Sequence, residues 1–302
     1  MVQPYNLVEL SNGPENKMKK LTFGLMSVAL VAIAMAQSAS LIRFDVKADS
    51  SDNYVVESTM KNTMNMPTGG EQDMTIKSSM KYALKYGAAD KDGKHGLDMT
   101  VTDIKMDMEG PMAEMAGQMG EMPKEMKFDG KIDNRYRVTE LKQAGASQNP
   151  MLAMMGSSMN WTMLFVELPE KEVSVGDSWD VTIPKNAMMG IPETTLKAKL
   201  VGEKDHNGTA CWAINLTGKI PTKVDMAEMM KGQPDPTGQM ANMEIFISGT
   251  MDMDTEALVA KTGGKAQLVT TKVKTKQTIE IKNVGMSMDM SGDMVMKMSL
   301  KN

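Results

Sequence analysis

Residues 286–298 read MSMDMSGDMVMKM, with a methionine at every second position on each side of Ser291-Gly292-Asp293. A period of two puts alternate side chains on one face of a β-strand, so this stretch predicts strands with one methionine-covered face. Three residues are a favoured length for a hairpin loop, and we therefore expect a hairpin that turns at Ser291-Gly292-Asp293. Its predicted pairs are Met290 with Met294, Met288 with Met296, and Met286 with Met298.

A second long hairpin is predicted in the N-terminal part of the chain, around the turn signal Pro67-Thr68-Gly69-Gly70. One register puts apolar residues opposite each other on a single face of both arms. The predicted pairs are Met66 with Met74, Met64 with Ile76, Met60 with Met80, Val56 with Leu84, and Tyr54 with Tyr86.

The chain contains 37 methionines and 18 leucines. Because flexible, polarizable thioethers suit surfaces that accept ligands of variable shape, these faces indicate a soft apolar cavity.

The composition is that of a folded protein without a nucleic-acid footprint. At 302 residues with 41% hydrophobic side chains, the chain is long enough to bury a sizeable core. The net charge is -4, the isoelectric point is near 5.4, and lysines alternate with acidic residues instead of forming basic blocks. We therefore expect no DNA or RNA partner.

A secretion signal is predicted near the N-terminus. Three lysines within residues 17–20 precede the apolar run 21–35, and Ala34-Met35-Ala36 forms a small-residue cleavage pattern. Because the run is short for a membrane span, we expect an extracytoplasmic protein, periplasmic or secreted, with no transmembrane span in its mature chain. The predicted segments are an uncertain N-terminal extension over residues 1–17 and a signal peptide over residues 18–36, cleaved near Ala36-Gln37.

The rest of the chain is predicted to contain two related β-rich halves. Two similar turns, Asp90-Lys91-Asp92-Gly93 and Asp205-His206-Asn207-Gly208, each lead into an alternating strand and then into a Met-Ala-Glu-Met segment. A duplicated unit of β-hairpin, helix and β-hairpin accounts for this weak repeat. The predicted boundaries are 41–145 for the first half, 146–175 for a helical connector and the start of a motif, and 176–302 for the second half, with both halves packed as one domain.

The sheets are expected to curve. Alternation slips by one residue at Thr102-Asp103 and at Lys282-Asn283, which predicts β-bulges, and bulges bend a sheet. The fold class that follows is mainly β with a few short α-helices, built as curved, half-barrel-like antiparallel sheets from two related halves.

Short helices are predicted at three places. The methionines at 108, 112, 115, 119, 122 and 126 step by three and four, which is one stripe of an amphipathic helix. Glycines at 117 and 120 weaken this helix by roughly 1 kcal/mol each. One hypothesis makes it a lid over the concave face, and the alternative is that the stripe packs permanently on the sheet. Residues 149–159 and 225–230 are the other candidates, and residues 231–239 are expected to form a loop.

Residues 168–179 read LPEKEVSVGDSW. This segment is similar to the central LP...VxVGDSW motif of a family of uncharacterised bacterial secreted proteins and lipoproteins, a domain of unknown function with a β-rich half on either side of the motif. The resemblance implies an envelope protein and no particular activity. By layout alone, curved sheets with helices in the concavity are similar to the periplasmic lipoprotein-carrier fold, which implies a cavity for acyl chains. Turn and strand signals account for the motif without catalysis, because Gly176-Asp177 makes a turn and Trp179 begins a strand.

We expect no enzyme and no cofactor. A hydrolase needs a nucleophile with a base, yet the only histidines, His95 and His206, fall in turn segments. The single cysteine, Cys211, lies in the apolar stretch 210–214, which predicts a buried structural thiol instead of a reactive thiolate. The sequence also lacks the motifs typical of zinc, phosphate and serine-hydrolase sites.

These features favour non-catalytic binding of a lipid or other apolar ligand, or association with an envelope protein. The candidate ligand-binding residues are Met60, Met64, Met66, Met74, Met80, Met112, Met115, Met119, Met122, Met286, Met288, Met290, Met294, Met296 and Met298. One alternative is a Cu(I) site at Met106, Met108, Met112 and Met115, because thioethers are soft ligands that select Cu(I). Two others are a purely structural envelope protein with a filled core and a store of exposed thioethers that consumes oxidants.

Overall fold

The computed structural model describes residues 39–66, 69–110, 113, 123–144, 161–186, 189–226 and 244–301. The chain divides into two compact units, Met1–Ala39 and Ser40–Asn302, and the features below belong to the second. Several predicted features lie outside the described residues and stay predictions. They are the extension and signal peptide over 1–36, the helix over 149–159, the loop over 231–239, and most of the methionine stripe that was assigned to a lid.

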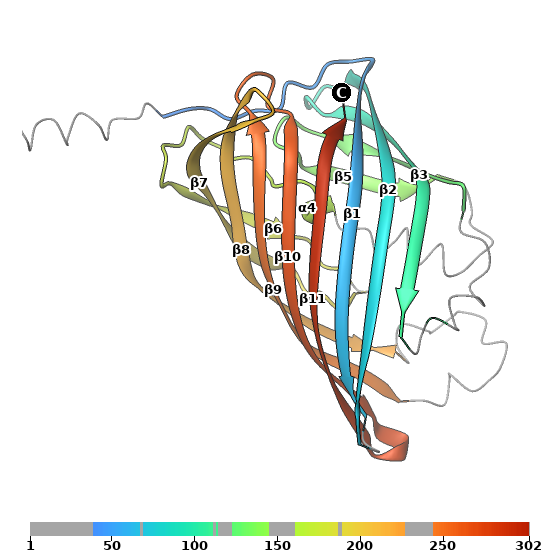
Figure 1. Cartoon of the computed structure of the whole chain (residues 1–302). Coiled ribbons are helices and arrows are strands. Elements are labelled where there is room, and N and C mark those ends of the chain that lie inside the picture. Colours follow the sequence, from blue (N-terminus) through green and yellow to red (C-terminus); the bar gives the residue numbers. More distant parts are fainter. Residues whose placement is uncertain are drawn as a thin grey trace, which may run out of the picture. The chain divides into compact units, whose positions relative to one another are not determined.

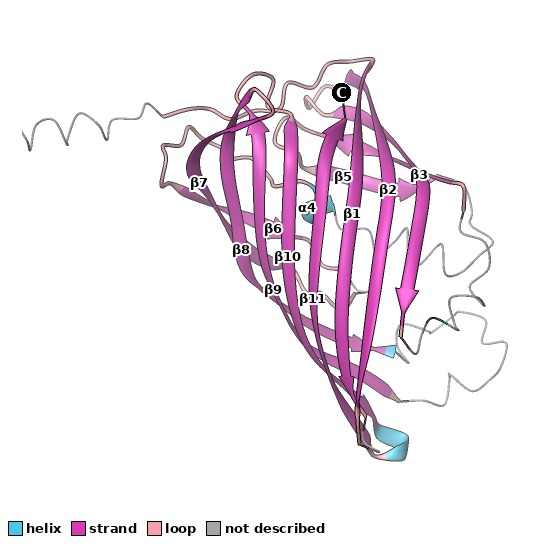
Figure 2. Ribbon diagram, in the orientation of Figure 1, coloured by secondary structure: helices cyan, strands magenta, loops and turns pink. Residues whose placement is uncertain are grey.

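Eleven antiparallel strands form one open, curved sheet (Figure 1). The strands are β1 (Ser50–Asn65), β2 (Glu71–Ala89), β3 (His95–Glu109), β4 (Glu125–Ile132), β5 (Val138–Gln143), β6 (Ser178–Ile183), β7 (Thr194–His206), β8 (Thr209–Asp225), β9 (Ile245–Ala260), β10 (Ala266–Ile281) and β11 (Met286–Lys301). A short helix, α4 (Trp161–Leu164), and a 3-10 turn, η2 (Lys282–Val284), are the helical elements with described bounds. Figure 2 shows how far strands dominate the described chain, so the predicted fold class, mainly β and curved, is confirmed.

The strand order is β5-β4-β3-β2-β1-β11-β10-β9-β8-β7-β6, so two meanders meet where the first and last strands pair. That central pair runs from Asn53 opposite Lys301 to Asn65 opposite Asp289. The sequence left open whether the halves share a sheet, and the structure answers that they do. The sheet bends so far that both edge strands, β5 and β6, lie behind the central strands in Figure 1. The predicted half boundaries and the repeat itself remain predictions.

The first predicted hairpin is present as β1 and β2, but its predicted register is wrong by four residues. Met60 lies opposite Ile76 and Tyr54 lies opposite Tyr82, where Met80 and Tyr86 were expected. The cause is a tighter turn, in which the Met66 amide donates to the Gly70 carbonyl at 3.1 Å and the ladder already begins at Asn65. A shift by an even number of residues preserves the faces, so the predicted alternation holds.

The predicted closing hairpin is wrong. β11 continues straight through Ser291-Gly292-Asp293 because it has a partner on each side, β1 and β10, along nearly its whole length. Folding it back would leave both neighbours with unpaired backbone groups, which are costly away from water. The period of two still puts all six predicted methionines on one face. The slip predicted as a bulge at Lys282-Asn283 is instead the turn η2, closed by Gly285 at φ 62°.

The bulge predicted at Thr102-Asp103 is confirmed. Asp103 has φ 52°, and the pairing of β2 with β3 shifts beside it. Two other predictions change because strands are longer than expected. Met108 belongs to β3 and Met126 is buried in β4, so neither end of the predicted methionine helix is helical. Asp225 closes β8 and Met226 is helical, so the helix predicted over 225–230 begins one residue later than expected, with its remaining residues outside the described ranges.

The two faces of the sheet have opposite character. The inner face carries the main hydrophobic core, and the outer face carries charged columns that pair across strands. Lys77 contacts Glu109 at 2.6 Å, Lys81 contacts Asp103 at 2.6 Å, and Lys219 contacts Asp252 at 3.6 Å. This is the apolar-in, charged-out pattern of an antiparallel sheet with one wet face. Within the described ranges, no helix has the length and apolar character needed to cross a membrane.

Cys211 lies on the outer face of β8, in a small separate cluster with Ala213, Leu258 and Leu268. The thiol is fully buried, and that burial raises its pKa, so it is held protonated. The predicted buried structural cysteine is therefore confirmed.

Candidate functional site: the inner face of the sheet

The inner face has two ends of different composition. Alternate strand residues supply the methionine end, whereas the aromatic end combines strand residues with residues from turns, connections and α4. We call the first the aromatic end, which consists of Phe44, Tyr54, Tyr86, Tyr136, Trp161 and Phe165. The second is the methionine end, which consists of Met60, Met64, Met74, Ile76, Ile247, Ile279, Met286, Met288, Met290 and Met294.

The aromatic end is a closed stack of rings. Phe44 stacks on Tyr136 with centroids 4.5 Å apart, and Tyr136 stacks on Phe165 at 5.0 Å. Trp161 of α4 lies on the other side of Phe165 at 4.5 Å, and Tyr54 of β1 meets the Phe165 edge at 5.3 Å. Each ring is buried. Since aromatic pairs are worth roughly 0.5–1.5 kcal/mol beyond their buried area, this end is strongly stabilised by the chain's own side chains.

Hydrogen bonds fix the polar atoms of this end. The Tyr136 hydroxyl donates to the Gly264 carbonyl at 3.0 Å and accepts from the Ala266 amide at 2.9 Å. Asp52, buried on β1, accepts from Lys265 at 2.5 Å and from the Tyr86 hydroxyl at 3.1 Å. These contacts join the β4–β5 turn and β1 to the β9–β10 turn, so the two meanders are tied across the end of the sheet.

Burial also shifts the titration of these tyrosines. It raises the pKa of Tyr82 to about 12. Burial is likewise the main cause of the raised pKa of Tyr54, Tyr86 and Tyr136, with the Asp52 carboxylate adding to it. All four phenols are therefore neutral at physiological pH.

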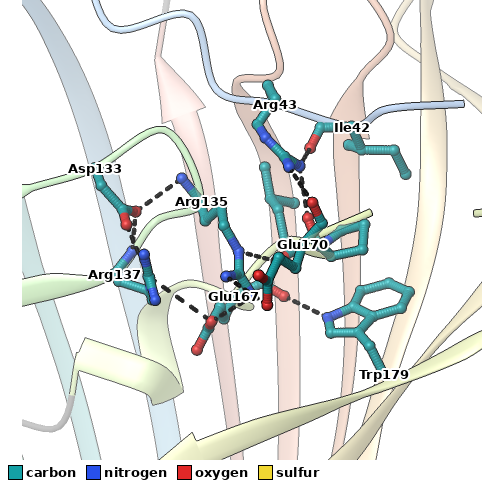
Figure 3. Close-up of polar contacts among 10 residues, drawn as sticks. Ile42, Arg43, Asp133, Arg135, Arg137, Glu167, Glu170 and Trp179 are labelled. Carbon is teal, nitrogen blue, oxygen red and sulfur yellow. Dashed lines mark hydrogen bonds and ion pairs between the residues drawn. The ribbon is translucent and has the colours of Figure 1, made fainter. Parts of the chain in front are cut away.

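Glu167 and Glu170, at the start of the segment with the VGDSW motif, contact arginines of the N-terminal segment and of the β4–β5 turn (Figure 3). Arg135, on the β4–β5 turn, contacts Glu167 at 2.8 Å and donates from Nε to the Leu168 carbonyl at 2.9 Å. Arg43 donates to the Pro169 and Glu170 carbonyls at 2.5 Å each. Three segments far apart in sequence thus meet at one cluster of arginines and carboxylates.

Two further contacts complete this cluster. Arg137 contacts Asp133 at 2.7 Å, and Trp179 of β6 donates from its ring nitrogen to the Glu167 carbonyl at 2.8 Å. Burial raises the pKa of Glu167, and the charges of Arg135 and Arg137 oppose that rise.

The motif turn is held by backbone contacts. Gly176 donates to the Leu200 carbonyl at 2.8 Å, and the Ser174 amide donates to the Asp177 carboxylate at 2.8 Å. These contacts agree with the structural role predicted for the motif.

A pocket of about 440 Å³ opens beside this end, between β5, α4 and the end of β6. Its walls include Leu141, Trp161, Phe165 and Pro184, with Arg137 at its margin. The pocket is separate from the predicted methionines.

At the methionine end, the exposed fraction of the inner-face side chains increases along each strand. Along β11, Met298 is 1% exposed and Met296 is 8% exposed, Met294 to Met288 are half-buried, and Met286 is 37% exposed. β10 repeats this gradient from Val269, buried, to Ile279, half-buried. The apolar side chains therefore extend beyond the part of this face that is buried among the described residues.

The structure brings many of the predicted ligand-binding methionines together. Met60, Met64, Met74, Met286, Met288, Met290 and Met294 share the methionine end, with Met66 half-buried beside the β1–β2 turn. Met296 and Met298 instead lie in the core, and Met80 packs against the core beside Tyr82. Met112, Met115, Met119 and Met122 lie outside the described residues.

Sequence reasoning placed Ile76, Tyr54 and Tyr86 on this face, but it missed Ile247, Ile279 and the other four residues of the aromatic end. Ile279 and Ile281 alternate on β10 as the methionines do on β11, and that period of two could have identified them. The aromatic residues carry no such signal, because Phe44, Tyr136 and Phe165 come from turns and connections.

The residues of the copper alternative are only partly described. Met106 and Met108 are half-buried neighbours on the inner face of β3, opposite Ser78 and Ile76, whereas the other two lie outside the described ranges. Among described residues, no group of three or more His, Cys, Asp or Glu side chains could hold a metal. His95 begins β3, where its Nδ1 lies 2.9 Å from the Gly87 carbonyl, and His206 ends β7.

Comparisons with known proteins give no family. No family model matches the chain, and no curated protein matches it. Among solved structures, lipovitellin, in a study of its lipid–protein interactions, is 10% identical over 85% of this chain with a TM-score of 0.46. This chain spans 25% of the lipovitellin chain.

Two other solved structures are similar at lower scores. DynF, from the dynemicin biosynthesis pathway of Micromonospora chersina, is 9% identical, with 86% of this chain and 85% of that one covered and a TM-score of 0.22. A LolA-superfamily protein from Nitrosomonas europaea is 8% identical, with 82% and 84% covered and a TM-score of 0.16. The likeness to the LolA-superfamily protein agrees with the layout comparison to the periplasmic lipoprotein-carrier fold. Membership of the family with the central LP...VxVGDSW motif is not confirmed. All three TM-scores are too low to indicate the function of this chain.

Proposed function

We propose that this protein is a non-catalytic, extracytoplasmic binding module that holds a lipid-like apolar ligand on the methionine end of its curved sheet. The observation that supports the proposal is the exposure gradient on β11. Apolar side chains on this strand run from fully buried Met298 to Met286, which is 37% exposed, with Gly292 between Met290 and Met294. Exposed apolar surface on a protein commonly marks a site of interaction.

The chemistry of the exposed part also supports an apolar ligand. Methionine and isoleucine provide apolar contact without fixed polar groups, and unbranched thioethers adapt to ligands of different shape. On β1, β2, β10 and β11 the inner face carries one charged side chain, Asp52, which lies at the opposite end and is paired with Lys265. A charged ligand group would find no counter-ion on these four strands at the methionine end.

The non-catalytic part of the proposal rests on the candidate nucleophile and bases. Cys211 is buried on the outer face, so its thiol cannot reach a ligand on the inner face. His95 and His206 lie at strand ends next to turns, outside the methionine end. Neither imidazole has a nucleophile among its hydrogen-bonding partners, which are Gly87 and Asn207.

The test is uptake of the hydrocarbon dye diphenylhexatriene, which fluoresces only in apolar surroundings. We expect the protein with Met290→Glu to lose most of this uptake, because a carboxylate on the inner face disfavours hydrocarbon. Ser291→Glu is the matched control, since it adds the same charge on the outer face of the same strand. Equal uptake by both variants and the unchanged protein would rule out the methionine end as the site.

Native mass spectrometry of gently purified protein separates the alternatives. A bound mass that matches a lipid supports the proposal, and a bound copper mass would favour the Cu(I) alternative. A bare mass combined with no dye uptake would favour a filled core and a structural role. Fractionation of cells that express the whole chain tests the extracytoplasmic location, which cytoplasmic retention of an uncleaved chain would contradict.

A further inference from the structure

A stripe of polar residues crosses the methionine end. It passes through five neighbouring strands, and we call it the amide stripe after its two carboxamide side chains. Its members are Asn62 on β1, Gly292 on β11, Thr275 and Gln277 on β10, Gly249 on β9 and Thr222 on β8. The strand registers put them side by side, since Asn62 faces Gly292, Gly292 faces Thr275, and Gly249 lies between Gln277 and Thr222.

Asn62 lies over Gly292. A Cβ at Gly292 would overlap the Asn62 carboxamide oxygen, so the missing side chain makes room for the amide. Thr275 borders the same space and donates to the Gly292 carbonyl at 3.3 Å, which leaves its hydroxyl oxygen able to accept. Among the described residues, the Asn62 side chain has no hydrogen-bonding partner, although it is half-buried. Its two donors and one acceptor are available to a ligand.

Gln277 on β10 also lies opposite a glycine, Gly249 on β9. A Cβ at Gly249 would overlap the Lys276 carbonyl, and it would also lie 2.9 Å from the Gln277 Cγ, so this glycine allows a close approach of β10. The Gln277 amide nitrogen reaches the Thr222 hydroxyl at 3.4 Å, and Thr222 is buried. Glycines on β9 and β11, on either side of β10, thus lie beside the two amides on an otherwise apolar face.

The stripe has apolar residues on both sides. Neighbouring positions on one face of a strand are about 7 Å apart. On one side the flanking residues are Met60, Met294, Val273, Met251 and Ile220, and on the other they are Met64, Met290, Ile279, Ile247 and Val224. On β1, β8 and β10 the arrangement is therefore apolar, neutral polar, apolar, and on β9 and β11 a glycine takes the middle position.

We propose that the amide stripe binds the ester or amide linkage of an acyl lipid, whose hydrocarbon chains lie on the apolar residues to either side. The inference rests on the proposed function and names the ligand class for the same site. A carbonyl in such a linkage accepts from Asn62 or Gln277 and carries no charge, in agreement with the uncharged surroundings. A peptide offers polar groups at every residue, about 3.3 Å apart, and most of them would meet the apolar rows.

The experiment compares two competitors that displace diphenylhexatriene, methyl oleate and 1-octadecene. Both are long single-chain apolar molecules, and only methyl oleate contains an ester. We expect methyl oleate to bind the unchanged protein about tenfold more tightly, since one or two hydrogen bonds that are shielded from water are worth about that factor. Asn62→Leu should remove this preference, and Thr275→Val, which keeps the side-chain shape, should reduce it. Neither variant should weaken binding of diphenylhexatriene or octadecene.

Asn65→Leu is the matched control, because Asn65 is exposed on β1 three residues away and points to the outer face. If dye and octadecene bind but methyl oleate shows no preference, the amide stripe inference fails and the proposed function stands. If a neutral apolar tripeptide displaces the dye better than methyl oleate, and Asn62→Leu abolishes that, the lipid assignment is wrong. If the dye does not bind at all, the proposed function itself fails.

Discussion

The two ends of the inner face use the same strands for different purposes. At the aromatic end, side chains from the N-terminal segment, the β4–β5 turn and α4 converge on β1 and β2 and exclude water. At the methionine end, the described strands provide apolar side chains that no such group of rings covers. The difference teaches that one continuous sheet can carry a filled core at one end of its strands and a partly exposed apolar face at the other.

The side chains match this division. Aromatic rings are rigid and large, so they suit a fixed core, whereas methionine has three rotatable bonds and suits a variable surface. Met290 and Tyr54 both lie on the inner face of the central pair of strands, yet only Tyr54 is fully buried. The comparison predicts that equal truncations will have unequal consequences.

The largest expected effect is a difference in stability between Phe165→Ala and Met290→Ala. Phe165 is 2% exposed and contacts three rings, so its truncation leaves a cavity and should cost about 3–5 kcal/mol of unfolding free energy. Met290 is half-buried, and its truncation should cost roughly 1 kcal/mol. Urea unfolding of both variants measures the difference, and equal losses would contradict the division.

Two glycines, Gly264 at the aromatic end and Gly292 at the methionine end, allow the stability of the two ends to be compared in the backbone. Gly264 has φ 62°, and a Cβ there would overlap the Arg43 carbonyl, which cannot move without displacing the N-terminal segment. Gly264→Ala should therefore cost about 2–5 kcal/mol, the sum of left-handed strain and overpacking. Gly292→Ala needs only the Asn62 and Thr275 side chains to move, and we expect roughly 1 kcal/mol or less. Thermal unfolding tests both, and a larger loss at Gly292 would reverse the expected order.

Of the two ends of the inner face, alkaline pH should act on the aromatic end. The buried tyrosines have a folded pKa raised above their ordinary value of about 10, with that of Tyr82 at about 12. The stability that neutral phenols provide is then complete below about pH 10 and is lost as the pH rises toward 12. We expect tyrosinate absorbance to appear together with loss of circular dichroism. Gradual ionisation of these tyrosines in a chain that stays folded would contradict their burial.

The smallest expected effect concerns Glu167 at the ion cluster. Its folded pKa is raised mainly by burial, so the stability associated with the protonated carboxyl is present below the unfolded value of about 4.3 and declines as pH rises. The difference in unfolding free energy between the unchanged protein and Glu167→Gln should therefore decrease as the pH rises above about 4.3. A rising difference for Glu167→Gln would mean that Arg135 outweighs burial.

Much of the strand content was predictable from the sequence because alternation is a local signal. The faces of β1, β2 and β11, the bulge at Asp103 and the buried Cys211 all follow from neighbours in sequence. The register of the first hairpin was not predictable, since every shift by an even number of residues keeps the same face. The choice of Met80 as the partner of Met60 satisfied the pattern as well as the true partner, Ile76, does.

The pairing of strands that lie far apart in the sequence was harder to predict. Ser291-Gly292-Asp293 has the composition of a turn, and only the presence of β1 and β10 on either side keeps it extended. The methionine end was found because its residues repeat within one strand. The amide stripe and most of the aromatic end were missed because each gathers single residues from several strands or connections, and no local period marks such a set.

The central pairing of β1 with β11 has a consequence for the order of folding. A chain synthesised from its N-terminus contains ten strands of this sheet before the one that joins its two meanders exists. Contacts between residues as distant as Asn53 and Lys301 form slowly, because the intervening chain must be ordered first. Until β11 is in place, β1 and β10 each present an open edge that can pair with another chain. The 16 residues of β11 thus close the sheet at its middle, and loss of them would leave two incomplete sheets where trimming an edge strand would leave a narrower one.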